Sequence, residues 1–232
     1  MTCRTIRVSS VPSHPVPHRI LYVFISCHQH RATAKQFPNN PFLGTRTVGA
    51  DGKAGAFAFQ SYATVKTRVD HFAAGLAAFG LVPGDKIALY SQNRADWLIA
   101  EQAAFCHSLV TVPLYETLGP DAAQYVLVHG ECRACVCTLD KVGTLTALIA
   151  AGKLPLLQLI VVMPLQAFDK APAKGAVAYD KVSEIKSAAT IMTMAALEAK
   201  GKATPSPHRP PQPSDLSTLC YTSGTTGMRS NH

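Results

Sequence analysis

The chain has 232 residues, 47% of them hydrophobic, with a mean hydropathy of +0.11, so it can bury the core of one domain and is not predominantly disordered. Its net charge is +8, but residues 1–53 hold seven Lys or Arg against one acid, and the rest hold 15 against 13. A nearly neutral body argues against a nucleic-acid-binding protein, which needs basic residues spread over its folded surface.

Residues 1–36 form a basic, acid-free head with three prolines at positions 12, 15 and 17. An arginine-bearing, acid-free head is typical of an organelle-targeting peptide. Because prolines interrupt the amphipathic helix of such a peptide, a disordered or mispredicted extension is the preferred interpretation. Its apolar run, residues 20–27, is shorter than the about 20 residues that cross a bilayer. We therefore expect no integral membrane segment, and peripheral membrane association stays open.

The regular part of the pattern begins at Ser61, a plausible helix N-cap. Val65, Val69, Phe72, Leu76 and Phe79 follow at spacings of four and three, which predicts a helix with a buried stripe that ends at Gly80. The elements expected next are strand 86–90, helix 95–107, strand 110–112, a helix opened by Pro120, strand 134–138, helix 142–150 and strand 156–163. This alternation predicts an α/β fold with a largely parallel sheet and helices on both faces.

The pattern weakens after residue 163. Residues 164–180 show no clear period, whereas residues 185–200 predict a helix that stops at Gly201. Residues 204–213 contain five prolines, which is typical of a surface linker. The linker leads to a last strand, residues 216–221.

Four possible zinc ligands lie within nine residues: His129, Cys132, Cys135 and Cys137. Side chains alternate along a strand, so Cys135 and Cys137 are expected on one face and Cys132 on the other, which argues against a tetrahedral site. Buried packing is the preferred interpretation, and it is also the one we favour for Trp97 and His107. Seven cysteines without a secretory signal indicate a reducing, intracellular location: the cytoplasm, or an association with the endoplasmic reticulum, the peroxisome or another organelle.

A loop of hydroxyl residues and glycines follows the last strand. Four hydroxyls and two glycines can turn several donors toward one point, as a phosphate group requires. The loop is neither a P-loop, because Met228 stands where that motif has lysine, nor a nucleophile elbow, because Tyr221 stands where that motif has glycine. The candidate phosphate-binding residues are Thr222, Ser223, Gly224, Thr225, Thr226 and Gly227.

The same loop resembles the signature loop of the adenylate-forming (AMP-binding) enzymes. Residues 91–101 and 211–216 are also similar, in the same order, to the long-chain fatty acyl-CoA synthetase branch of that superfamily. The most branch-specific stretch is Val112-Pro113-Leu114-Tyr115-Glu116-Thr117-Leu118-Gly119-Pro120. The resemblance extends over residues 37–227 and implies the incomplete N-terminal part of the large domain of such an enzyme, after the head at 1–36 and before a divergent tail at 228–232.

This resemblance implies an ATP-dependent ligase that joins a fatty acid to CoA through an acyl-AMP intermediate, with Mg²⁺ on the phosphates. The six loop residues are then the ATP-binding positions, while no catalytic residue and no metal ligand is assigned. The tail departs from the family pattern, because Arg229, Ser230 and Asn231 replace its proline, lysine and glycine. We expect an N-terminal fragment that is inactive by itself. The alternative is a non-enzymatic remnant that binds phosphate weakly or pairs with a partner.

Overall fold

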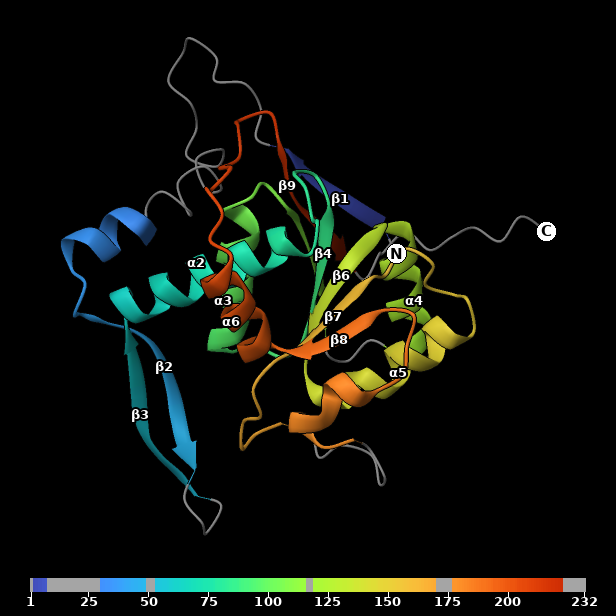
Figure 1. Ribbon diagram of the computed structural model, residues 1–232, viewed down its shortest axis with the longest axis horizontal. Coiled ribbons are helices and arrows are strands. Elements are labelled where there is room, and N and C mark those ends of the chain that lie inside the picture. The colour runs from blue at the N-terminus through green and yellow to red at the C-terminus, as the bar shows by residue number, and fades with distance from the viewer. Residues whose placement is uncertain (1, 8–29, 49–52, 116–118, 170–176, 223–232) are drawn as a thin grey trace.

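The computed structural model describes residues 2–7, 30–48, 53–115, 119–169 and 177–222 (Figure 1). Seven strands form one sheet in the order β1-β9-β5-β4-β6-β7-β8, and two more form the hairpin β2-β3. Within the sheet only β1 runs antiparallel, against β9. The predicted α/β fold with a largely parallel sheet is therefore confirmed.

The helices and strands have the following bounds along the chain: β1 Thr2–Arg7, β2 Pro41–Val48, β3 Ala54–Ser61, α2 Tyr62–Ala78, β4 Lys86–Tyr90, α3 Ala95–Phe105, β5 Val110–Leu114, α4 Pro120–His129, β6 Cys132–Cys137, α5 Leu139–Ala150, β7 Leu159–Val162, the 3-10 helix Tyr179–Glu184, β8 Thr190–Thr193, α6 Met194–Ala203 and β9 Leu216–Thr222. A further helical segment covers residues 30–36.

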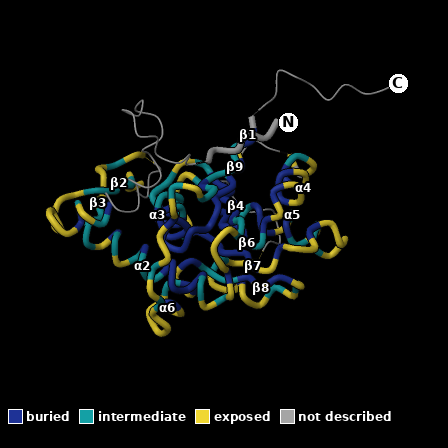
Figure 2. The backbone as a smooth tube through the Cα atoms, turned by 90° about the horizontal axis from the view of Figure 1, so that it is seen from above, coloured by how far each residue is buried: buried dark blue, intermediate teal, exposed yellow. Residues whose placement is uncertain are grey.

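Helices cover both faces of the sheet, as the alternating pattern predicts. On one face α2, α3 and α6 pack together, and on the other lie α4 and α5 (Figure 1). Strand β5 lies on one side of β4 and β6 lies on the other. Because both connections are right-handed, the helix between β4 and β5 lies on one face of the sheet and the helix between β5 and β6 lies on the opposite face. Strands β4, β5, β6 and β7, between the two layers, are almost entirely buried, whereas β8 and β9 are only partly buried (Figure 2).

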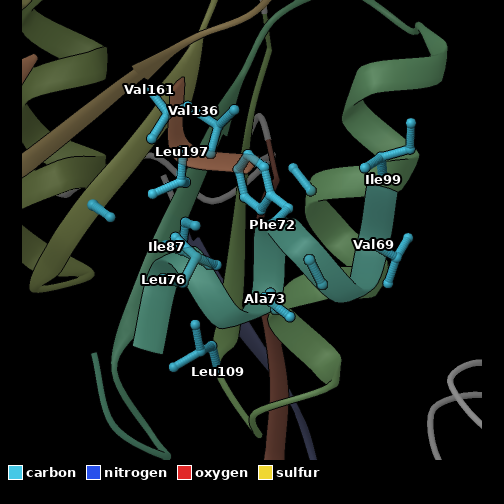
Figure 3. Close-up of a cluster of buried hydrophobic side chains, with 14 of the residues drawn as sticks. Val69, Phe72, Ala73, Leu76, Ile87, Ile99, Leu109, Val136, Val161 and Leu197 are labelled. Carbon is cyan, nitrogen blue, oxygen red and sulfur yellow. The ribbon is translucent and has the colours of Figure 1, made fainter. Parts of the chain in front are cut away.

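Helix α2 begins and ends where the sequence predicts. The hydroxyl of Ser61 accepts a hydrogen bond from the backbone N–H of Thr64 at 3.2 Å, and Gly80 after the helix has a φ of +80°, which only glycine adopts without strain. Four side chains of the predicted stripe are buried and the fifth, Phe79, is partly buried. Figure 3 shows Val69, Phe72 and Leu76 directed into one cluster. Each such side chain contributes about 1.5–3 kcal/mol through burial.

The predicted helix over residues 185–200 is wrong. Strand β8, Thr190–Thr193, occupies its middle, and α6 begins only at Met194. Gly201 does not stop the helix but lies within it, against α2, where an added Cβ would come within 1.8 Å of the carbonyl oxygen of His71. The glycine therefore serves close helix packing, which a sequence pattern cannot distinguish from a helix stop.

Besides β8, two strand regions have no counterpart among the predicted elements. The hairpin β2-β3 precedes α2 and projects from the body of the molecule (Figure 1), with Phe57 and Phe59 exposed on it. Strand β1 lies in the N-terminal head, for which we expected disorder or a targeting role, and it pairs with β9 from Thr2 opposite Thr222. The targeting role of the head stays a prediction.

Candidate functional site

Strand β9 delivers the chain to the candidate phosphate loop. Its observed bounds, Leu216–Thr222, confirm the predicted last strand, and Thr222 is its final residue. The other five predicted positions, Ser223, Gly224, Thr225, Thr226 and Gly227, lie outside the described residues. Ligands of open parallel sheets bind at the carboxyl ends of the strands, and Thr222 lies at the carboxyl end of β9, which runs parallel to β5.

Polar contacts attach the middle of β9 to β5. Thr218 donates its hydroxyl to the backbone carbonyl of Thr111 at 2.9 Å, and Thr111 donates its own hydroxyl to Thr218 at 3.0 Å. Because Thr111 is fully buried, this reciprocal pair satisfies groups that water cannot reach. The pair attaches β9 to β5 four residues before the strand ends at Thr222.

Helix α4 contacts the end of β9 through a side-chain hydrogen bond. The buried side chain of Tyr221 places its hydroxyl 2.6 Å from Nδ1 of His129, the last residue of α4. The His129 ring stacks on Tyr125 with ring centroids 5.3 Å apart, and Tyr125 lies edge-on to Tyr221 at 6.2 Å. His129, which the sequence pattern grouped with possible zinc ligands, therefore contacts the residue that precedes Thr222.

The three cysteines of β6 share one face of the sheet, so the prediction that Cys132 lies opposite the other two is wrong. The register against β4 skips Arg133, and this bulge turns Cys132 into the same cluster as Cys135 and Cys137. Burial raises the pKa of the Cys132 thiol to about 12. A hydrogen bond to Cys137 and burial also raise the pKa of Cys135. Within the described ranges no three His, Cys, Asp or Glu residues are arranged to hold a metal ion.

The loop after β4, part of the 91–101 stretch, forms a buried ionic cluster. The guanidinium of Arg94 is 1% exposed and contacts Asp169 at 2.7 Å and Asp96 at 3.3 Å. It also donates a hydrogen bond to the carbonyl of Pro164. Arg68 of α2 joins Asp96 to Glu198 of α6, at 3.2 and 2.9 Å. These charges connect the loops after β4 and β7 to the three helices α2, α3 and α6, which is a structural role at the carboxyl edge of the sheet.

Three other residues named from the sequence are placed as follows. Trp97 packs on the core of the α2-α3-α6 face, and His107 is buried just after α3, as predicted for both. Burial, followed by the charge of Arg209, lowers the pKa of His107. Tyr115 is 56% exposed just after β5, before residues 116–118, which lie outside the described chain.

Comparison with known proteins agrees with these features. The model of the family of AMP-binding enzymes matches residues 30–229. The chain is 32% identical over 220 residues to the peroxisomal long chain acyl-CoA synthetase 7 of Arabidopsis thaliana, covering 95% of this chain and 29% of that protein. It is 33% identical over 186 residues to fatty acyl-CoA synthetase A of Dictyostelium discoideum, covering 80% of this chain and 26% of that protein. The chain thus spans less than a third of the length of these relatives.

Solved structures share the fold. The adenylation domain of a carboxylate reductase from Mycobacterium chelonae superposes with a TM-score of 0.69 at 23% identity, over 87% of this chain and 33% of that one. An anthranilate CoA ligase in complex with anthranoyl-AMP gives a TM-score of 0.62 at 17% identity, over 87% and 32%. In the described part of the chain, no helix combines the length and apolar character that a membrane span needs.

Proposed function

Because the chain belongs to the family of AMP-binding enzymes, we propose that it supplies the ATP-phosphate-binding part of a long-chain fatty acid–CoA ligase. The observation that carries the proposal is the position of Thr222. It ends strand β9, which lies between β5 and β1, at the carboxyl edge of a largely parallel sheet, and the sequence continues directly into residues 223–227. The match to the family model extends through this loop, to residue 229.

The proposed reaction has two steps. A fatty acid carboxylate oxygen attacks the α-phosphorus of ATP, forming acyl-AMP and releasing pyrophosphate, and the CoA sulfur then attacks the acyl carbon and releases AMP. Negative charge moves onto the departing pyrophosphate in the first step. Backbone N–H groups and hydroxyls of residues 222–227 would stabilise that charge without reorganising, which is the usual contribution of a preorganised anion site.

In the proposed reaction Mg²⁺ would be a cofactor and CoA would be a substrate. The carboxylates of Asp96 and Asp169 are already engaged by arginines, so neither offers a free metal ligand at this edge. The loop hydroxyls and the ATP phosphates are the oxygen donors that suit Mg²⁺, which would neutralise phosphate charge there. Fatty acid, ATP and CoA are the proposed partners of the whole enzyme.

The test is fatty-acid-dependent exchange of labelled pyrophosphate into ATP by the purified chain. The matched control is the double variant Ser223→Ala, Thr225→Ala, which removes two loop hydroxyls and excludes contaminating enzymes. Exchange above background that the double variant abolishes would establish carboxylate activation by this chain. Equal exchange by both proteins would attribute the activity to a contaminating enzyme and would contradict the proposal.

A second candidate function is phosphate binding without catalysis, which needs the loop at the end of β9 and no second reactant. The chain spans 29% of the length of the Arabidopsis relative. On this proposal Mg²⁺-pyrophosphate binds, the double variant weakens binding, and exchange stays at background. Binding and exchange measured on the same preparation therefore separate the two functions.

We also propose an organellar location, supported by the basic head and by the peroxisomal relatives named in the comparison. A fluorescent protein fused after Gln36 should then leave the cytosol and colocalise with an organelle marker. Replacing Arg4 and Arg7 by glutamine provides the control. A diffuse signal from the unmodified head would contradict targeting by residues 1–36.

A further inference from the structure

We propose that the hydrogen bond between His129 and Tyr221 is a positioning contact, which orients the end of β9 and thereby the entry into the phosphate loop. The inference rests on the proposed function, because it assigns a role within that same site. His129 would act through Tyr221 on Thr222 and would not itself touch the phosphate.

The geometry of the pair indicates a specific hydrogen bond and not only van der Waals packing. The Tyr221 side chain is 2% exposed, yet its hydroxyl meets Nδ1 of His129 at 2.6 Å. A buried hydroxyl without a partner is costly, so this bond favours one position of the ring. Gly130 follows His129 with little space beside it, since an added Cβ would lie 2.8 Å from the carbonyl oxygen of Val126, and the Tyr221 hydroxyl is a further neighbour at 3.6 Å.

The surrounding contacts show why the hydrogen bond between His129 and Tyr221 matters for the position of the end of β9. The pairing of β9 with β5 consists of Thr218 opposite Thr111, which is four residues before the strand ends. Beyond it, the described backbone partner is β1, with Tyr221 opposite Cys3. On the α4 side the phenol of Tyr221 therefore provides the anchor, and the stacked ring of Tyr125 orients His129, with an interplanar angle of 14°.

The consequence for anion binding follows from the direction of the donors. A phosphate-binding loop is effective when its N–H groups already converge on one point, and a loop that must be ordered on binding loses affinity. Since Thr222 directly follows Tyr221, rotation of the tyrosine redirects the first residue of the loop. The pair should thus affect pyrophosphate affinity more than it affects the fold.

The experiment measures Mg²⁺-pyrophosphate affinity by calorimetry on the full chain, with the thermal unfolding midpoint of each protein recorded in parallel. Tyr221→Phe removes only the hydroxyl, and His129→Leu removes its partner. His129→Asn keeps a hydrogen-bonding atom at the place of Nδ1 and should restore binding. Val128→Ala, on the neighbouring exposed residue of α4, is the control.

We expect Tyr221→Phe and His129→Leu each to weaken binding by about two- to twelve-fold, the fold-change that corresponds to one net hydrogen bond. The double variant should lose no more than either single one, while His129→Asn and Val128→Ala should bind like the unmodified protein. Unchanged affinity in Tyr221→Phe would overturn this inference alone, as would a lowered unfolding midpoint without loss of affinity. No binding by the unmodified chain would overturn the proposed function, and this inference with it.

Discussion

The two faces of the sheet are stabilised in different ways. The face covered by α2, α3 and α6 combines an apolar cluster with buried charges, in which Arg68 and Arg94 bridge three acids drawn from separate segments. The face covered by α4 and α5 combines its apolar cluster with three thiols and the aromatic group around Tyr221. The first face connects elements far apart in the chain, whereas the second supports the strand that carries the candidate loop.

This difference suggests how each face fails. Buried ion pairs tolerate the loss of one partner poorly, because the remaining charge is left without compensation in a medium of low polarity. Apolar and thiol packing responds instead to changes of volume or to forced ionisation. Perturbations chosen for each mechanism should therefore separate the two faces experimentally.

The largest effect is expected from Arg94→Leu on the α2-α3-α6 face. The substitution leaves Asp169 and Asp96 without their 1%-exposed partner, and we expect a loss of about 3–5 kcal/mol in the free energy of unfolding, measured by urea denaturation. Lys86→Gln, which breaks the exposed pair with Glu131 at 2.9 Å, is the control and should change stability much less. Equal losses would show that the Arg94 cluster is not effectively buried.

Two glycine-to-alanine substitutions should act in opposite directions on the two faces. Gly201→Ala forces α6 away from the His71 carbonyl of α2 and should cost about 1–3 kcal/mol. Gly143→Ala lies within α5, where an added Cβ meets nothing within 4 Å, and should stabilise the protein by about 0.5–1 kcal/mol. Urea denaturation measures both, and destabilisation by Gly143→Ala would contradict the helical packing described for α5.

The decrease in the free energy of unfolding at alkaline pH should depend on a buried thiol of the α4-α5 face. The pKa of Cys132 is raised to about 12 from an ordinary 9.0, so the folded state disfavours the thiolate. Its contribution to stability is complete below pH 9 and is lost as the pH rises from 9 toward 12, at up to about 1.4 kcal/mol per pH unit. Cys132→Ala should make this decline shallower in urea denaturation between pH 8 and 10.5. Parallel curves for the two proteins would count against the burial of this thiol.

The smallest effect is expected at acid pH, from the other face. Burial lowers the pKa of His107 and of His30 below the ordinary 6.5, so protonation favours the unfolded state. Stability should be complete above pH 6.5 and fall as the pH drops through the lowered values. His107→Asn should flatten this decline in unfolding midpoints recorded from pH 7 to 5. A decline as steep as that of the unmodified protein would exclude His107 as a contributor.

Local signals predicted much of the fold correctly. The apolar spacing after Ser61, the cap at Ser61 and the turn at Gly80 depend on residues a few positions apart, and α2 follows them. Strand β4 has the predicted bounds because its run of apolar residues is buried on both faces. Strand β9, which precedes the candidate loop, is likewise confirmed, whereas the loop itself stays a prediction.

What the sequence by itself determined, then, is the family and the order of helices and strands from α2 to β7, while the candidate loop stays a prediction. Only the tertiary structure decided that Gly201 is a helix contact, that a bulge brings Cys132 beside Cys135, and that His129 binds Tyr221 across 92 residues of chain. The physical reason is that propensity and periodicity act between neighbours in the sequence. Close helix approach, strand register and side-chain pairing depend instead on segments that meet only when the chain folds.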